Sequence, residues 1–248
     1  MRSPLAPIAL VATVLAAFLA SEPSAYRESI PGTLVTFEMV LVPGDDPLYI
    51  GRTEVTWDMY DVFALGLDAP AKTGGADAIA RPSQPYGAPD YGWGHAGYPA
   101  ISITRNAAEA FCEWLSGKTG KTYRLPTEAE WTRAASGAAG SGVMSPDRRD
   151  AAAWHAGNAS GRTHPVAART ADALGLFDLF GNAAEWVTMP DGTLVTRGGS
   201  FRDPIGAVGP DARAVQDDSW NERDPQLPKS RWWLSDGPFV GFRLARKP

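Results

Sequence analysis

A chain of 248 residues with 44% hydrophobic residues, nine tryptophans among them, can bury a sizeable core. Its 26 glycines and 21 prolines exceed ordinary usage, which favours many turns and long loops over a helix bundle. The formal charge is −5, from 23 basic and 28 acidic residues, and no basic block stands out. This balance argues against nucleic acid as a partner.

The N-terminus has the pattern of a secretory signal. Arg2 precedes an apolar run from Ile8 to Ala20, and small residues follow. The run is shorter than the ~20 apolar residues that a membrane span needs. We therefore predict a signal peptide over residues 1–25, a secreted or periplasmic location, and no stable membrane span after cleavage. Pro23 sits where a small residue is preferred, which leaves an uncleaved anchor open.

The first elements after the signal are a strand and a short helix. Residues 37–44 form an apolar run that ends in a Pro-Gly turn, which predicts a strand. Thr56 can cap a helix over Trp57–Leu65, whose apolar residues fall on one face. The stretch 69–97 is rich in glycine, proline and aromatic residues and predicts a long loop.

Two longer helices are expected after this loop. Asn106 fits an N-cap, apolar residues follow at helical spacing, and Gly117 would end the helix. Thr127 and Glu130 form a capping box that opens a helix over 128–135.

Most of the remaining chain is predicted as loop, with short strands at 194–197 and 240–245. This combination indicates an α+β domain with little regular secondary structure. No composition break or repeat divides the chain, so we expect a lead-in over 26–36 and one domain over 37–248. The single cysteine, Cys112, rules out an intrachain disulfide and is predicted to be a buried thiol.

Four segments, spread in order over the chain, carry a resemblance to a known family. They are 51–56, 98–131, 175–186, and 197–201 with 241–243. The strings Arg-Leu-Pro-Thr-Glu-Ala-Glu-Trp and Gly-Asn-x-x-Glu-Trp within them are the most specific. Together they resemble the formylglycine-generating enzyme (sulfatase-modifying factor) family. The resemblance implies a C-type-lectin-like fold with a shallow surface cleft, but it does not transfer an activity.

Oxidases of this family bind copper(I) through two cysteines, five residues apart, and turn a substrate cysteine into formylglycine. Thiolates suit this soft ion. The matching positions in this chain fall on Asp203 and Val208, and neither supplies a thiolate. Copper is therefore disfavoured, and Cys112 alone does not replace the pair.

A second branch of the fold uses non-haem iron, held largely by histidines of an additional helical domain that this chain lacks. His95, His155 and His164 lie in separate stretches without ligand spacing, which favours ordinary hydrogen-bonding roles. An iron site assembled from distant loops stays open at this point.

The resemblance also implies calcium, held by side-chain and carbonyl oxygens. The matching positions are Asp178, Gly181, Ala183 and Glu185. Such oxygens are the ligands that calcium prefers. In the alternative interpretation, Asp178 caps a turn and Glu185 pairs with a buried arginine. A second calcium site would begin at Asn158 and Ala159, although the loop that carries its other ligands is shortened.

The segment 220–233 combines three tryptophans with charged and amide side chains. Tryptophan faces near amides can line a groove for a glycan or an extended peptide. The residues expected at such a cleft are Ser200, Phe201, Arg202, Asp203, Trp220, Trp232 and Trp233. The alternative is that Trp232 and Trp233 fill the core while the charged side chains are solvated. Asp217 and Asp218 could add carboxylates, but an adjacent acidic pair is most often a solvated turn.

Three functional hypotheses follow. The first is an exported, non-oxidase binding or maturation module for a peptide, protein or glycan. The second is an enzyme in which Asp203, with Asp217 or a histidine, holds iron. The third is a formylglycine-generating oxidase with an unrecognised cysteine arrangement. The first is favoured because the sequence lacks the copper ligands and gives no clear replacement for them.

Overall fold

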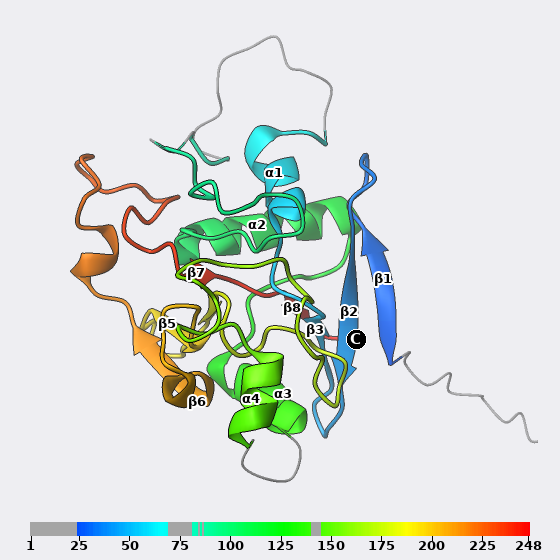
Figure 1. Cartoon of the computed structure of the whole chain (residues 1–248). Coiled ribbons are helices and arrows are strands. Elements are labelled where there is room, and N and C mark those ends of the chain that lie inside the picture. Colours follow the sequence, from blue (N-terminus) through cyan, green and yellow to red (C-terminus); the bar gives the residue numbers. More distant parts are fainter. Residues whose placement is uncertain (1–23, 69–80, 84, 86, 140–144) are drawn as a thin grey trace, which may run out of the picture.

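The structure, a computed structural model, describes residues 24–68, 81–83, 85, 87–139 and 145–248 (Figure 1). Nearly all of the predicted signal peptide and much of the predicted loop 69–97 therefore lie outside the described residues. Within the described part, no helix is long and apolar enough to cross a bilayer.

The first sheet joins the beginning of the domain to its end. It contains β1 (Ala25–Ser29), β2 (Thr36–Val42), β3 (Leu48–Gly51) and β8 (Ala245–Arg246), in the order β1-β2-β3-β8 with antiparallel neighbours. The predicted strand near 37 corresponds to β2. Most of β1 falls within the lead-in expected over 26–36, and it pairs with β2 along its whole length.

The second sheet has the order β6-β5-β4-β7 and supports the candidate site. Its strands are β4 (Ala184–Val187), β5 (Val195–Gly198), β6 (Gly209–Val215) and β7 (Val240–Gly241). Only the β4–β7 pair is parallel. The strand predicted over 240–245 is divided into two strands, β7 and β8, which belong to different sheets. The residues between these two strands are buried.

Helix α1 (Trp57–Leu65) has the predicted bounds, and helix α2 (Arg105–Thr119) is longer than predicted. Its N-cap is Thr104, whose hydroxyl accepts a hydrogen bond from the amide of Ala107 at 3.1 Å. The predicted cap, Asn106, instead donates its side-chain amide to a carbonyl of a distant loop. The helix continues past Gly117 and ends at Gly120, which has the left-handed conformation typical of a helix C-terminus.

Helix α3 (Glu128–Ala139) begins with the predicted capping box. The amide of Glu130 donates to the hydroxyl of Thr127 at 3.2 Å, and the amide of Thr127 donates to the Glu130 carboxylate at 2.9 Å. Helix α4 (Pro146–Ala152) was not predicted, because it buries no residue and so has no apolar periodicity. In Figure 1, α1 and α2 lie in the upper half of the domain, and α3 and α4 lie in its lower half.

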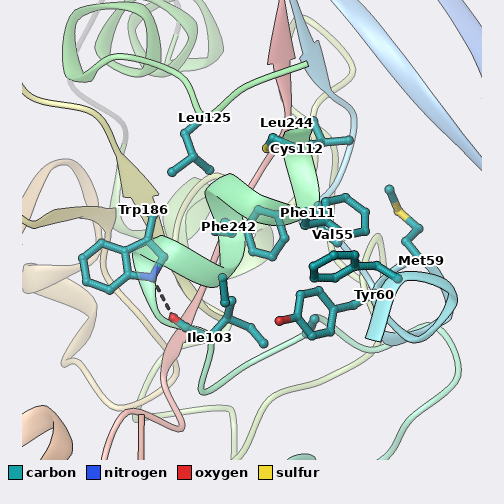
Figure 2. Packing of buried hydrophobic residues seen from close by; sticks show 14 of the residues in the cluster. Val55, Met59, Tyr60, Ile103, Phe111, Cys112, Leu125, Trp186, Phe242 and Leu244 are labelled. Carbon is teal, nitrogen blue, oxygen red and sulfur yellow. Dashed lines mark hydrogen bonds between the residues drawn. The ribbon is translucent and has the colours of Figure 1, made fainter. Parts of the chain in front are cut away.

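The core consists of two buried apolar clusters. The larger contains aromatic side chains of α1 and α2 and of the C-terminal segment, and Figure 2 shows part of it around Phe111 and Phe242. Trp186, fully buried in the same cluster, donates its ring N–H to the carbonyl of Ile103 at 2.8 Å. Cys112 is buried in this cluster, as predicted. The mixture of short helices and strands with long loops confirms the predicted α+β class.

Candidate functional site

The chain turns sharply where β5 ends. Gly198 and Gly199 have positive φ angles of 90° and 74°, and a Cβ on Gly198 would lie 2.5 Å from the carbonyl oxygen of Leu179. Only glycine fits this backbone. Beyond the glycines, Oδ2 of Asp203 accepts hydrogen bonds from the amide of Ser200 at 2.8 Å and from its hydroxyl at 2.9 Å. The Asp203 carboxylate therefore holds the turn together.

A cavity of about 460 Å³ opens beside this turn, and we call it the Ser200 cleft. Small residues on one face of the second sheet form its floor: Ala184, Thr196, Ala212 and Ala214. Larger side chains form its walls: Arg202, Trp220 and Phe239. Arg213 also borders the cavity, but its side chain alternates to the other face of β6, toward Glu128 of α3. The strand register places the small floor side chains next to one another on the same face of the sheet. Because they fill little space, a cavity remains between the larger side chains around them.

The walls of the Ser200 cleft combine aromatic rings with positive charge. The ring centroids of Trp220 and Phe239 are 5.0 Å apart, and the guanidinium of Arg202 lies 4.5 Å from the Phe239 centroid. A ligand with carboxylate or carbonyl oxygens would find donors here, and the rings offer apolar contact.

The two positions that match the family cysteines differ in environment. Asp203 lines the cleft, but its carboxylate is engaged by Ser200. Val208 is 1% exposed and packs in the second apolar cluster, which also contains Trp131. Cys112 lies in the other cluster, away from both positions. No sulfur donor among the described residues therefore faces the cleft.

The predicted cleft residues do not form one surface. Ser200, Arg202, Asp203 and Trp220 line the Ser200 cleft. Phe201 and Trp232 are 2% and 3% exposed, so their placement at a ligand surface was wrong. Trp233 is partly exposed but lines two other cavities. The core-filling alternative therefore holds for Trp232, because a domain with few helices and strands uses large aromatics to fill space. Trp220 is 7% exposed and belongs to the same apolar cluster, so it presents only a small part of its surface to the cleft.

At the predicted calcium position, Glu185 has the arginine partner of the alternative interpretation. Arg243 donates from Nη2 to Oε1 of Glu185 at 2.6 Å and from Nε to both carboxylate oxygens at 2.9 and 3.0 Å. Trp131 donates its ring N–H to the same carboxylate at 2.8 Å. Gly181 is required locally, since a Cβ there would lie 2.1 Å from the carbonyl oxygen of Trp154.

Asp178 is buried beside this ion pair with one oxygen unpartnered. Its Oδ2 accepts the amide of Ala167 at 2.7 Å, but no described group donates to Oδ1. Burial raises the pKa of Asp178 to about 6. A further buried carboxylate that no sequence signal indicates, Glu54, accepts hydrogen bonds from Asn182 at 3.0 Å and from the amide of Ala183 at 2.9 Å.

Burial raises the pKa of Glu54 well above its usual range, and the negative charges of Asp178 and Glu185 raise it further. Three buried carboxylates, Glu54, Asp178 and Glu185, thus lie near Arg243, and only Glu185 forms an ion pair with it. The charged forms of Glu54 and Asp178 are therefore disfavoured in this site, and a cation beside the open oxygen of Asp178 would stabilise them. The engaged carboxylate of Glu185 does not fit the ligand role that the resemblance gives it.

The predicted second calcium position has protein partners instead. The carbonyl oxygen of Ala159 is 2.8 Å from Nε2 of His164, and Oδ1 of Asn158 accepts the amide of His155 at 2.9 Å. The imidazole of His164 stacks on Trp154 with 3.7 Å between ring centroids. Both oxygens are therefore satisfied by the short loop itself.

The three histidines are held by different neighbours. His95 lies between two aspartates, His155 is 2.8 Å from Oδ1 of Asp150, and His164 caps the Ala159 carbonyl. Over the residues that the structure describes, no three side chains of histidine, cysteine, aspartate or glutamate lie close enough together to hold a metal.

A model of the sulfatase-modifying factor enzyme 1-like domain matches residues 42–248. Two curated serine/threonine-protein kinases named Pkn1, from Chlamydia trachomatis serovar L2 and Chlamydia pneumoniae, share 37% and 34% identity with this chain over 93 residues. These residues are 38% of the chain and 14% of each kinase, so the similarity covers a small part of the kinases.

Solved structures cover more of the chain. Treponema denticola variable protein 1 superposes with a TM-score of 0.64 and 22% identity, over 92% of this chain and all of that one. PvdO from Pseudomonas aeruginosa gives a TM-score of 0.58 and 23% identity, over 89% of this chain and all of PvdO. CarF gives 0.55 and 23%, over 82% of this chain and 87% of CarF. These likenesses establish the fold alone.

Proposed function

We propose that this chain, which belongs to the sulfatase-modifying factor enzyme 1-like family, is an exported module that binds an extended peptide in the Ser200 cleft. The observation that carries the proposal is the form of the cleft: a floor of small side chains, aromatic walls and the arginine Arg202, where family oxidases have their cysteines. The signal-like N-terminus supports export.

A peptide is favoured because the cleft adjoins β6, which is the edge strand of its sheet in the described residues. An extended peptide can add to such an edge through main-chain hydrogen bonds, while its side chains enter neighbouring pockets. The guanidinium of Arg202 would select a carboxylate in the peptide. A glycan is the second candidate, because sugar rings can lie against Trp220 and Phe239.

The enzymatic alternatives have weaker support. Asp203 and Asp217 line different cavities, and Asp217 accepts a hydrogen bond from the amide of Ser219 at 2.9 Å, as expected of a solvated turn. An iron site that used both aspartates would need the two segments to rearrange. A thiol-based oxidase would need a second cysteine, which the sequence does not contain.

We also infer that calcium binds beside Asp178. The unpartnered Oδ1 of this residue and the excess of buried carboxylates support a divalent cation there. Calcium prefers carboxylate and carbonyl oxygens. The carboxylate of Asp178 and the carbonyls of Gly181 and Ala183 would hold it, while Glu185 stays paired with Arg243.

Selection of a random peptide library on the purified protein tests the peptide proposal. We expect enriched peptides that carry an acidic residue, and binding that Ala214→Trp abolishes by filling the cleft floor. Val215→Trp is the matched control, because this exposed neighbour points to the other face of β6. Absence of enrichment, or equal binding by both variants, would refute the proposal. Binding confined to a glycan array would favour the second candidate.

A further inference from the structure

A second cavity, of about 400 Å³, lies against α1 and shares no described lining residue with the Ser200 cleft. We call it the Trp233 cavity, and its main lining residues are Trp57, Asp61, Ala64, Leu65, His95 and Trp233. The ring N–H of Trp233 donates to the carbonyl of Ser83 at 2.7 Å. This bond fixes the orientation of a ring that stays partly exposed.

The charged groups at this cavity sum to a negative value. Nε2 of His95 is 2.7 Å from Asp61, and Nδ1 is 2.8 Å from Asp90. A fully protonated His95 therefore compensates only one of two carboxylates. Of these two carboxylates, Asp61 lines the cavity, and Asp90 holds the far side of the imidazole. No lysine or arginine is among the described residues that line the cavity. A cation that enters therefore meets an attractive potential.

Aromatic faces surround the same space. The ring centroids of Trp57 and Trp233 are 6.4 Å apart with an interplanar angle of 28°, and His95 stacks on Trp57 at 5.2 Å. Tryptophan faces attract cations through their quadrupole. Because Trp57 is almost completely buried, the partly exposed ring of Trp233 is the surface that a ligand would contact.

The few hydrogen-bond acceptors that line the cavity favour an alkylated ammonium over a primary ammonium. A primary ammonium needs acceptors for three N–H groups. The cavity offers one carboxylate, Asp61, which already bonds His95, and its other walls include the apolar side chains of Ala64, Leu65 and Pro82. An alkylated ammonium has no such requirement, because it carries the charge on methyl groups that can pack against apolar walls and an indole ring.

We propose that the Trp233 cavity binds a quaternary ammonium group, held between the indole face of Trp233 and the carboxylate of Asp61. This site is independent of the peptide cleft, since the two cavities have no described lining residue in common. Either proposal can therefore fail without the other.

Isothermal titration of the full chain with choline and with 3,3-dimethylbutan-1-ol, its neutral isostere, tests the proposal. We expect choline to bind about tenfold more tightly than the alcohol, because only choline gains the cation–π and ionic contacts. Equal affinities, or no choline binding at tens of millimolar, would overturn it. Nα-acetyl-lysine methylamide should bind more weakly than choline, and equal binding would contradict the assignment to an alkylated ammonium.

Two substitutions locate the site. Trp233→Leu and Asp61→Asn should each weaken choline binding about fivefold to tenfold, and the asparagine can still bond His95. Asp46→Asn is the matched control, since this exposed aspartate pairs with Lys247 and lines neither cavity. Thermal melts establish that each variant is folded. Unchanged choline affinity in folded Trp233→Leu would refute the assignment.

Discussion

Glu185 and Arg243 form a salt bridge in which neither side chain is exposed to solvent, with Nη2 2.6 Å from Oε1. Glu185 belongs to β4 of the second sheet. Arg243, between β7 and β8, also donates to the carbonyl of Gly51 at the end of β3, at 2.9 Å, and to that of Phe177 at 2.8 Å. One guanidinium thus connects both sheets and the loop that carries Asp178.

Arg243→Met should destabilise the protein by about 3–5 kcal/mol, because it leaves the Glu185 carboxylate buried without its charge partner. Chemical denaturation of wild type and variant measures the difference. Arg213→Met is the control, since Arg213 pairs with Glu128 at a partly exposed position and should cost less than about 1 kcal/mol. Similar small losses for both variants would mean that the buried pair does not hold the sheets together.

Calcium should raise the melting temperature of the wild-type protein, since a ligand that binds only the folded state stabilises it by mass action. Asp178→Asn should remove this rise by taking away a charged oxygen ligand. Glu28→Gln serves as a control with the same chemical change at a carboxylate that Lys121 pairs in the first sheet. A calcium-induced rise that persists in Asp178→Asn would place the ion elsewhere, and no rise in wild type would contradict calcium binding under the conditions used.

His95 should contribute stability that disappears at alkaline pH. Burial acts to lower the pKa of His95, but its hydrogen bonds to Asp61 and Asp90 outweigh burial and raise the pKa above its ordinary value. A raised folded-state pKa means that the contribution is complete below the unfolded value of about 6.5 and is lost as pH rises through the folded value.

The comparison of wild type with His95→Gln measures this contribution. The unfolding free energy of wild type should exceed that of His95→Gln by more at pH 5.5 than at pH 8.5. The change in this excess between the two pH values should be less than about 1 kcal/mol, because the His95 side chain is 44% exposed. A difference that is the same at both pH values would show that the two aspartates do not hold a protonated imidazole.

Local sequence signals predicted the elements that local contacts determine. The capping box of Thr127 and Glu130 formed as expected, since its four atoms lie within one helical turn. The start of α2 was misplaced because Asn106 has a partner 125 residues away, which no local pattern reveals. Helix α4 was missed because a helix that buries no residue has no apolar stripe.

The candidate site was only partly predictable for the same reason. The resemblance located the turn at Ser200, but which aromatic residues fill the core and which line cavities depends on packing across distant segments. Trp232 packs against Phe63, whereas its neighbour Trp233 bonds Ser83 and faces open space. Glu54 carries no signal of its role in the sequence, because its partners come from the Gly-Asn segment 128 residues later.

The thiol of Cys112 should be unreactive in the native protein, which also bears on copper. It is 2% exposed in α2, and burial raises the pKa of the thiol, so little thiolate forms at neutral pH. We expect reaction with Ellman's reagent to be slow until denaturant unfolds the chain. Asp191→Cys, at an exposed turn, supplies the control: one thiol should react at once and the other only on unfolding. Fast reaction of the wild-type protein would mean that Cys112 opens to solvent and could reach a soft metal.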